Sequence, residues 1–157
     1  MGNPMSIDEN MQIRAFEEKD IDNCAQLFAQ VFSSEPWNEP WTASSASTRI
    51  RHFFDESGFR GLVGYEGEKL LGFVLGNLQP WLDEKQFRIE EFCVQPNLQK
   101  RKVGSTLLQK LHERMRAEGI TSINLITSPD GPAFKFFLAN RYVESARASF
   151  MHFDLLI

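Results

Sequence analysis

The sequence predicts an α/β protein in which helices pack against a mixed β-sheet. Some segments alternate apolar and polar residues, as half-buried strands do, whereas others repeat apolar residues at three- and four-residue spacing, as amphipathic helices do. In chain order these segments read β-α-α-β-β-β-α-β-α-β-β. The length of 157 residues fits one domain that buries a core without disulfide bonds.

The first third of the chain predicts a strand and two helices. Residues 1–10 are polar and are expected to form a flexible N-terminus, with the single domain spanning residues 11–157. The alternation in residues 11–16 predicts the first strand. Asp20 is a candidate cap for the first helix, and the second helix is expected from about residue 44 to residue 57.

The middle of the chain predicts a hairpin and a third strand. Gly67 lies in a Glu-Gly-Glu-Lys turn, where glycine adopts a positive φ without strain. The returning strand is expected over residues 70–78, a connection over residues 79–85 and the next strand over residues 87–94.

The last third predicts two more helices and three more strands. A helix with apolar residues four apart ends at Gly119, which is placed to cap it. A buried strand is expected over residues 122–127, and Pro132 suits the first turn of the following helix. Two closing strands are expected, one from Tyr142 onward and one at SFMHFDLL, residues 149–156.

Composition excludes several classes of protein. The net charge of −4 argues against a nucleic-acid or anionic-membrane surface, and no segment is long and apolar enough to span a bilayer. The two cysteines do not form a disulfide framework, which favours a cytoplasmic location. The three histidines have no metal-ligand spacing with the cysteines, so no metal site is expected.

Three consecutive cations at residues 100–102 precede a predicted helix whose first turn contains Gly104 and two hydroxyl side chains. The first amides of a helix lack internal partners and carry partial positive charge, so they bind anions. Gly104 lets a phosphate approach the backbone closely. The segment therefore indicates a polyphosphate site, and a solvated basic turn is an equally weighted alternative. It matches neither a Walker A loop nor a dinucleotide fingerprint.

The segment IEEFCVQPNLQKRKVGSTLLQKL, residues 89–111, resembles the central motif of the GNAT superfamily of acetyl-CoA-dependent N-acetyltransferases. Members read V-x-P, then Q/R-x-x-G-x-G/A, then a helix with paired leucines. The matching residues are Val94, Pro96, Gln99, Gly104, Leu107 and Leu108. Lys102 stands where the first glycine is usual. AFKFFLANRY, residues 133–142, resembles the family's A-x-x-F-Y-x-x-x-G-F/Y. The resemblance implies a mostly antiparallel central sheet flanked by helices.

The resemblance implies that the protein uses acetyl-CoA and releases CoA. In the family the pantetheine arm lies between two parallel strands that splay apart, which here end at Val94 and Thr127. Asp130 lies where many members carry an asparagine near the cofactor, with a helix cap as the alternative. Phe137 stands at the position of a tyrosine that in the family often protonates the departing thiolate. The resemblance therefore places Phe137 beside the cofactor. The remaining implied contacts are Phe92, Cys93 and Val94 for pantetheine, and Gln99, Lys100, Arg101, Lys102, Val103, Gly104, Ser105 and Thr106 for pyrophosphate.

Glu90 and Glu91 are the catalytic candidates. An ammonium group cannot attack a thioester until a base removes a proton, and a strand carboxylate suits that role. Alternation sends adjacent side chains to opposite faces unless a bulge intervenes. In the family's small-molecule enzymes paired acids occupy this position, although either residue alone would also fit an ordinary exposed carboxylate. Cys93 is expected to be a small buried hydrophobe rather than a nucleophile.

Two Trp- and acid-containing loops, residues 35–41 and 79–85, predict the acceptor site. Aromatic rings with nearby carboxylates bind cationic amines. The candidate substrate-binding residues are Glu35, Trp37, Trp41 and Trp81. Packing of the tryptophans within their loops is an alternative. EPWNEPW also resembles a stretch of bacterial aminoglycoside-acetyltransferase-like members.

The sequence thus favours an N-acetyltransferase that moves an acetyl group from acetyl-CoA to a primary amine of a small cationic molecule. Two alternatives remain: an acyl-CoA-binding module with little or no catalysis, which Phe137 and Lys102 would suit, and an N-acetyltransferase for proteins or peptides. A small-molecule amine is the expected partner, and a homodimer is left open.

Overall fold

The structure is a computed structural model that describes residues 10–156, except for the side chains of residues 99–101. The chain separates into two compact units, Met1–Asn124 and Leu125–Ile157, and each unit is described here by itself. The expectation of one domain over residues 11–157 therefore stays a prediction. Nearly all of the N-terminus that was expected to be flexible lies outside the described residues.

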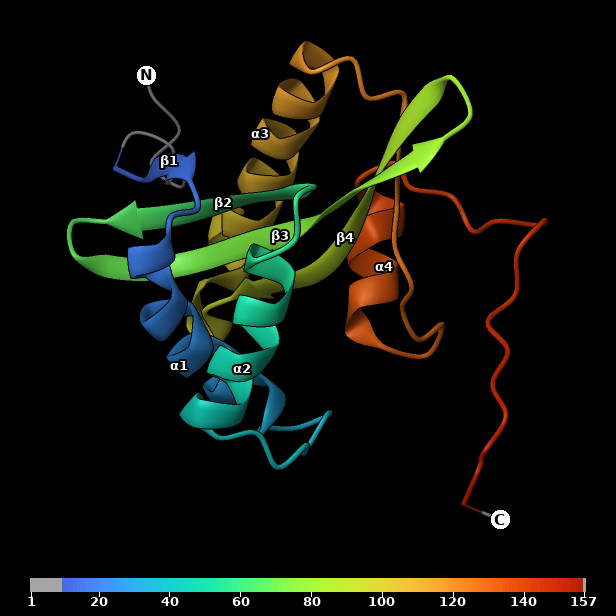
Figure 1. Cartoon of the computed structure of the whole chain (residues 1–157). Coiled ribbons are helices and arrows are strands. Elements are labelled where there is room, and N and C mark those ends of the chain that lie inside the picture. Colours follow the sequence, from blue (N-terminus) through green and yellow to red (C-terminus); the bar gives the residue numbers. More distant parts are fainter. Residues whose placement is uncertain (1–9, 157) are drawn as a thin grey trace. The chain divides into compact units, whose positions relative to one another are not determined.

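The first unit is built on a five-stranded sheet with the order β1-β2-β3-β4-β5 (Figure 1). The strands are β1 (Gln12–Ala15), β2 (Phe59–Glu66), β3 (Lys69–Trp81), β4 (Glu84–Val94) and β5 (Ser122–Asn124). The first three pairings are antiparallel, and β4 and β5 are parallel. The predicted mixed, mostly antiparallel sheet is confirmed.

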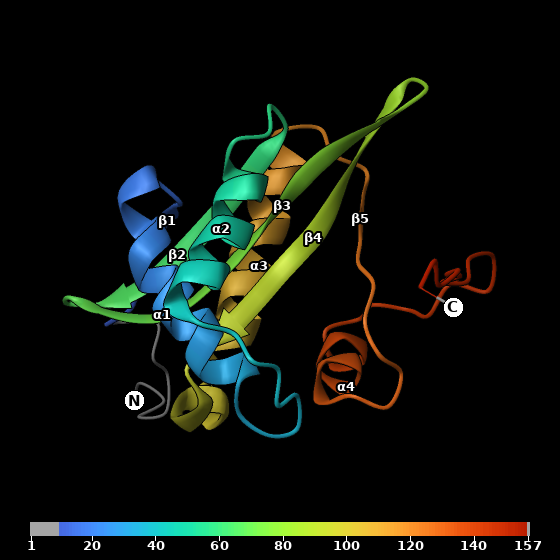
Figure 2. The same cartoon turned by 60° about the horizontal axis from the view of Figure 1, so that its bottom comes forward.

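Helices cover both faces of this sheet (Figure 2). The first unit contains the 3-10 helices η1 (Glu18–Asp20) and η2 (Pro96–Arg101) and the α-helices α1 (Ile21–Phe32), α2 (Ala43–Phe54) and α3 (Val103–Ala117). Helices α1 and α2 pack on one face and α3 packs on the other. The second unit contains α4 (Pro132–Ala139). Within residues 10–156, no helix combines the length and apolarity required to cross a bilayer.

Local sequence explains where these helices begin and end. The Thr42 hydroxyl accepts a hydrogen bond from the Ser45 amide, and Ser45 reciprocates at the Thr42 amide, which caps the start of α2. The predicted capping glycine after α3 is confirmed, because Gly119 has a φ of +78°. Gly67 likewise has a φ of +61° in the turn between β2 and β3.

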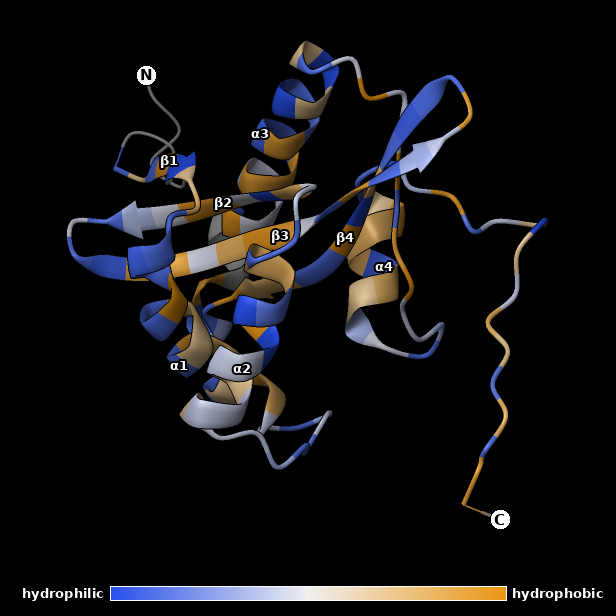
Figure 3. Cartoon of the chain, in the orientation of Figure 1, coloured by the Kyte–Doolittle hydropathy of each residue, from blue (hydrophilic) through white to orange (hydrophobic). Residues whose placement is uncertain are grey.

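The core fills both sides of β3. Phe73 and Leu75 join the buried apolar cluster formed with α1 and α2, whereas Gly72 lies against Leu107 of α3. Hydropathy follows this arrangement, since the middle of β3 is apolar and the hairpin beyond it is largely hydrophilic (Figure 3).

The prediction of a connection over residues 79–85 is wrong for most of that segment. Strand β3 continues to Trp81, which pairs with Glu84 of β4. The chain reverses in the two residues between them, and Leu82 adopts a φ of +50°. Because Pro and charged residues disfavour strands only weakly at a hairpin end, the pairing extends past them.

The strand expected over residues 122–127 is confirmed only for Ser122–Asn124. The two closing strands are a wrong prediction, because residues 140–156 contain no strand. Alternating apolar residues fit a pleated surface but do not supply a partner edge, and the described residues of the second unit contain no strand with which they could pair. Exposed apolar side chains in this segment include Phe150, Phe153 and Leu155.

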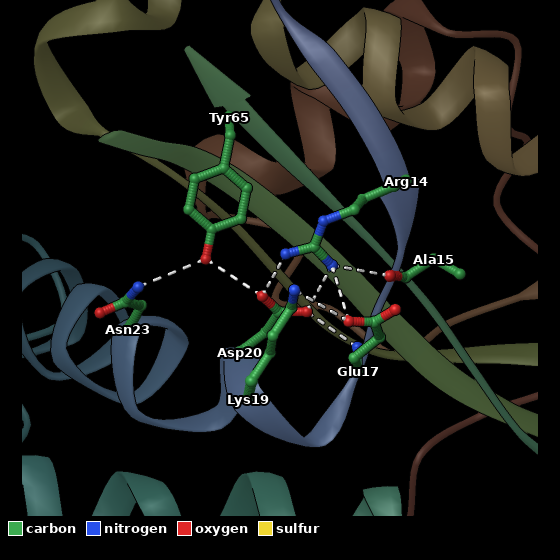
Figure 4. Close-up of polar contacts among 7 residues, drawn as sticks. All are labelled: Arg14, Ala15, Glu17, Lys19, Asp20, Asn23 and Tyr65. Atoms are coloured by element: carbon green, nitrogen blue, oxygen red, sulfur yellow. Dashed lines mark hydrogen bonds and ion pairs between the residues drawn. The ribbon is translucent and has the colours of Figure 1, made fainter. Parts of the chain in front are cut away.

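A polar network joins β1, η1 and β2 around the buried carboxylate of Asp20 (Figure 4). Arg14 donates two hydrogen bonds to Asp20, from Nη1 at 2.8 Å and Nη2 at 2.7 Å. The Glu17 amide and the Tyr65 hydroxyl donate two more, at 2.8 and 3.2 Å. Burial opposes ionisation of Asp20, but these donors together outweigh it and lower the pKa of the carboxyl.

Candidate active site

A β-bulge in β4 lies at the paired glutamates. Leu75 of β3 pairs with Glu91, but the next residue, Gly76, pairs with Ile89, so Glu90 is an extra residue without an opposite partner. A Cβ atom on Gly76 would lie 1.9 Å from the Arg88 carbonyl oxygen. The close approach of the strands at the bulge therefore requires glycine at position 76.

The bulge directs Glu91 toward the face covered by α1 and α2. Its side chain is 9% exposed, and Arg49 of α2 donates a hydrogen bond to it from Nε at 2.5 Å. This is the single described hydrogen bond between the two side chains. The Arg49 side chain is 41% exposed, so the pair joins a buried carboxylate to a partly solvated cation.

The surroundings of Glu91 raise the pKa of its carboxyl to about 7. Burial is the largest cause, and repulsion from Glu90 and Glu39 adds to it. Arg49 opposes these effects without cancelling them. A carboxyl with a pKa near neutrality can both accept and release a proton at physiological pH, as a general base must.

Aromatic rings flank the Arg49 guanidinium. Its Cζ lies 5.1 Å from the centre of the Phe53 ring and 5.9 Å from the centre of the Trp41 ring. Trp41 is held in turn by an edge-to-face contact with Phe28 at 4.9 Å. Sequence reasoning identified Trp41 but missed Arg49, because an arginine on an amphipathic helix usually belongs to the solvated face.

Asn77 is a second residue that sequence reasoning missed. It lies two residues beyond Leu75 on the same face of β3 and is 3% exposed. Its Oδ1 is buried without a hydrogen-bond partner among the described residues. The face that carries Glu91 therefore holds another polar group buried in the fold.

The other predicted acceptor residues are dispersed. Trp37 packs against Phe32 at 5.0 Å, and Glu35 is exposed in the same connection between α1 and α2. Trp81 is 62% exposed at the far end of β3. Trp81 lies six residue steps along the strand from Leu75, about 20 Å, so Trp81 does not adjoin Glu91.

The parallel pairing of β4 and β5 is short. Gln86–Arg88 pairs with Ser122–Asn124, and no pairing between the two strands extends farther. Residues Phe92–Val94 lie in the part of β4 beyond this pairing. The second of the two strands implied for a pantetheine arm ends at Asn124 rather than at Thr127, so the splayed pair stays a prediction.

The predicted phosphate site lies at the start of α3. Lys102, which stands in place of a glycine, adopts the left-handed conformation with a φ of +61°. The amides of Val103, Gly104 and Ser105 precede the first intrahelical hydrogen bond, which the Thr106 amide donates to Lys102. The Thr106 hydroxyl also donates to the Lys102 carbonyl. The side chains of Gln99, Lys100 and Arg101, also predicted to contact phosphate, lie outside the described residues.

Two further predicted cofactor residues belong to the second unit. Asp130 is exposed, and Gly131 rather than Asp130 is the N-cap of α4. Phe137 is buried and its ring packs edge-to-face with that of Tyr142, with 5.1 Å between the ring centres. A contact of either residue with acetyl-CoA stays a prediction.

The Cys93 side chain is a buried part of the core beside α1 and α2. Burial raises the pKa of its thiol far above the ordinary value. A thiol in this environment is a poor nucleophile, which agrees with the expected packing role.

Comparisons with known proteins place this fold in a family. The family model described as "Acetyltransferase (GNAT) family" matches residues 22–139. A curated L-2,4-diaminobutyric acid acetyltransferase from Nocardia farcinica (strain IFM 10152) is 35% identical over 65 residues. That match covers 41% of this chain and 33% of the relative, so it spans about a third of the relative's length.

Solved structures share the fold at low sequence identity. An aminoglycoside acetyltransferase from an uncultured soil metagenomic sample, in complex with sisomicin, has a TM-score of 0.75 and 17% identity, and the alignment covers 96% of this chain and 99% of the other. The aminoglycoside N-acetyltransferase AAC(6′)-Iy in complex with CoA has a TM-score of 0.71 and 16% identity, with 90% and 93% covered. Because the family model spans most of its length, this chain belongs to the acetyltransferase (GNAT) family.

Proposed function

We propose that this protein transfers an acetyl group from acetyl-CoA to a primary amine of a small cationic molecule, with Glu91 as the general base. The observation that carries the proposal is the Glu91 carboxyl, which is buried beside a bulge and has a pKa of about 7. An acyl-CoA-binding module would have no need of such a group.

The start of α3 and the outer part of β4 are suited to hold acetyl-CoA. The amides of residues 103–105 and the positive charge of residues 100–102 would bind the pyrophosphate. Backbone groups of Phe92, Cys93 and Val94 would bind the pantetheine arm. When bound, acetyl-CoA supplies the acetyl group: its C–S bond breaks as the C–N bond to the amine forms, giving the N-acetylated amine, CoA and one released proton.

Glu91 would accept a proton from the ammonium group of the acceptor. Because burial raises the pKa of Glu91 to about 7, its carboxylate is basic enough to take this proton at neutral pH and can release it after turnover. The bulge fixes the side chain on the face of α2, where Trp41, Phe53 and Glu39 favour a cation. Glu90 would add negative potential.

The proposed acceptor class rests on this chemistry and on the relatives. The names of the similar proteins mention L-2,4-diaminobutyric acid and aminoglycosides. Both kinds of molecule are small and carry several amino groups. A carboxylate beside aromatic faces suits an ammonium group on either kind of molecule. A folded protein would have to present an extended terminus or lysine, so we favour the small molecule.

An acceptor panel tests the proposal directly. Release of CoA is measured with acetyl-CoA and a set of free diamines, amino acids with a second amino group, aminoglycosides and a lysine-containing peptide. We expect turnover with at least one free amine. Tight binding of acetyl-CoA without turnover would support the binding module, and acetylation of the peptide alone would support the protein-modifying alternative.

A substitution separates the cofactor site from the catalytic site. Gly104→Glu should abolish acetyl-CoA binding, because the side chain fills the phosphate site and repels its charge. Binding by the unchanged protein should weaken as salt increases, since part of the attraction is screened. Undiminished affinity of the Gly104→Glu variant in calorimetry would contradict the phosphate site.

A homodimer stays a prediction, which light scattering at several protein concentrations tests.

A further inference from the structure

The Arg49 guanidinium lies among two aromatic rings and a carboxylate, which are the groups that form cation-binding sites. One side is formed by the Phe53 ring, 5.1 Å from the guanidinium carbon, and another by the Trp41 ring at 5.9 Å. The buried Glu91 carboxylate contacts the guanidinium Nε. Aromatic faces and a carboxylate together bind cationic groups, and the cation held here belongs to the protein itself.

We propose that Arg49 is a placeholder, whose guanidinium occupies the place of the acceptor's reactive ammonium group and is displaced from Glu91 when the acceptor binds. This inference rests on the proposed function. It adds that the acceptor competes with a side chain of the protein for its binding place. The exchange also replaces one cation beside the Glu91 carboxylate by another, which avoids leaving a buried charge unpaired.

The contacts of Arg49 suit displacement. It reaches Glu91 by one hydrogen bond, and its side chain is 41% exposed. By contrast, Arg14 uses two guanidinium nitrogens on Asp20, where the Glu17 amide donates as well. A single-point contact from a partly solvated side chain is easier to replace than a two-point contact inside a larger network.

The exchange changes what Glu91 can do. A guanidinium does not give up its proton at physiological pH, so Glu91 paired with Arg49 has no proton to accept. An ammonium group in the same place has a proton that the carboxylate can take. Binding of the acceptor thereby converts an inert pair into a reactive one.

Kinetics of three proteins test the exchange. Arg49→Met keeps an unbranched apolar chain between the rings and removes the competing charge. With the best amine of the panel, we expect its KM to fall about tenfold relative to the unchanged protein. Arg49→Lys keeps a charge but loses the planar stacking group, so its KM should lie between the two.

A KM that stays the same or rises in these variants would overturn the proposal, because Arg49 would then assist binding. Folding of each variant is checked by thermal melting. If Arg49→Met does not fold, the comparison rests on Arg49→Lys, which retains a cation beside Glu91.

A second experiment needs no turnover and so separates this inference from the proposed function. Arg49→Ala empties the place between the rings, and methylguanidinium chloride is titrated into it by calorimetry. We expect measurable binding to Arg49→Ala, and at least about tenfold weaker binding to Arg49→Met and to the unchanged protein, whose places are filled. Equal binding to all three proteins would contradict a cation site, even if the protein acetylates amines.

Discussion

Asp20 and Glu91 are both buried carboxylates that contact an arginine, yet their pKa values move in opposite directions. At Asp20, burial opposes ionisation, but Arg14 binds through two nitrogens and two further donors complete the network, so the pKa falls. At Glu91, burial is the largest effect and Glu90 and Glu39 add repulsion, which the one described hydrogen bond from Arg49 does not offset, so the pKa rises to about 7. Burial opposes ionisation at both sites, and the balance between burial and the hydrogen-bond donors, rather than the mere presence of an arginine, decides the sign.

The comparison assigns the two pairs different roles. A carboxylate held ionised by four donors joins elements of the fold, here β1, η1 and β2. A carboxylate kept basic by burial is suited to move a proton. Substitutions should therefore lower stability at Asp20 and turnover at Glu91, and the stability contributions of the two sites should depend on pH with opposite signs.

Removal of the Asp20 charge should give the largest loss of stability. Asp20→Asn leaves Arg14 facing a neutral amide and disrupts the hydrogen bonds to the carboxylate. We expect the free energy of unfolding in urea to fall by about 3 kcal/mol. Glu18→Gln is the matched control on the same 3-10 helix, because its ion pair with Arg51 is exposed and should contribute less than about 1 kcal/mol. Equal losses in both variants would remove the distinction.

Glu91→Gln should lower turnover without lowering stability. We expect kcat with the best amine to fall about a hundredfold or more, the usual contribution of a general base. The free energy of unfolding should be unchanged or higher, because a buried group that resists ionisation is replaced by a neutral one. Glu90→Gln serves as the control and should lower kcat less. A larger decrease for Glu90→Gln would reassign the base.

The pH dependence of stability should have opposite signs at the two sites. The raised pKa of Glu91 means that its contribution is fully present below about pH 4.5 and is lost as the pH rises to about 7. The loss amounts to about 3 kcal/mol. The lowered pKa of Asp20 means that its contribution is present above about pH 3.8 and is lost as the pH falls further.

Urea unfolding at several pH values measures this difference. The unchanged protein is compared with Glu91→Gln between pH 4.5 and 7, and with Asp20→Asn below pH 5. A difference from Glu91→Gln that stays constant over its range would mean that the Glu91 pKa is not raised.

In the same range, kcat/KM of the unchanged protein should increase as Glu91 ionises, after correction for ionisation of the amine.

The smallest expected effect comes from the outer part of the Asp20 network. Tyr65→Phe removes the hydroxyl that donates to Asp20 at 3.2 Å. We expect a loss of about 1 kcal/mol in the free energy of unfolding. If the loss matches that of Asp20→Asn, the donors act as one cooperative unit instead of as separate contributions.

Local patterns predicted the four α-helices and, in chain order, the five strands that the structure describes, because spacing along the chain determines which residues share a face. The closing strands at residues 142–156 could not be settled in this way, since a strand depends on an edge supplied by another part of the chain. The same reason explains the connection over residues 79–85, where the tight turn at Leu82 lets the strands continue.

The candidate site was predictable in part. The paired glutamates and the start of α3 stand in a continuous segment that resembles a family motif. Arg49 lies 42 residues before Glu91 in sequence, and no local pattern links them. The burial that raises the pKa of Glu91 depends on the packing of α2 over the sheet, which spacing alone does not give.

Gly76 limits how this protein can change. With a methyl group there, β3 could not approach the Arg88 carbonyl, and the strands would have to separate or pair without the extra residue. A shift of one residue would send the Glu91 side chain to the opposite face of the sheet, away from α2. Position 76 admits glycine alone, because a larger residue would clash with the Arg88 carbonyl. Directed evolution toward new acceptors should therefore vary the helices above the sheet and leave this residue untouched.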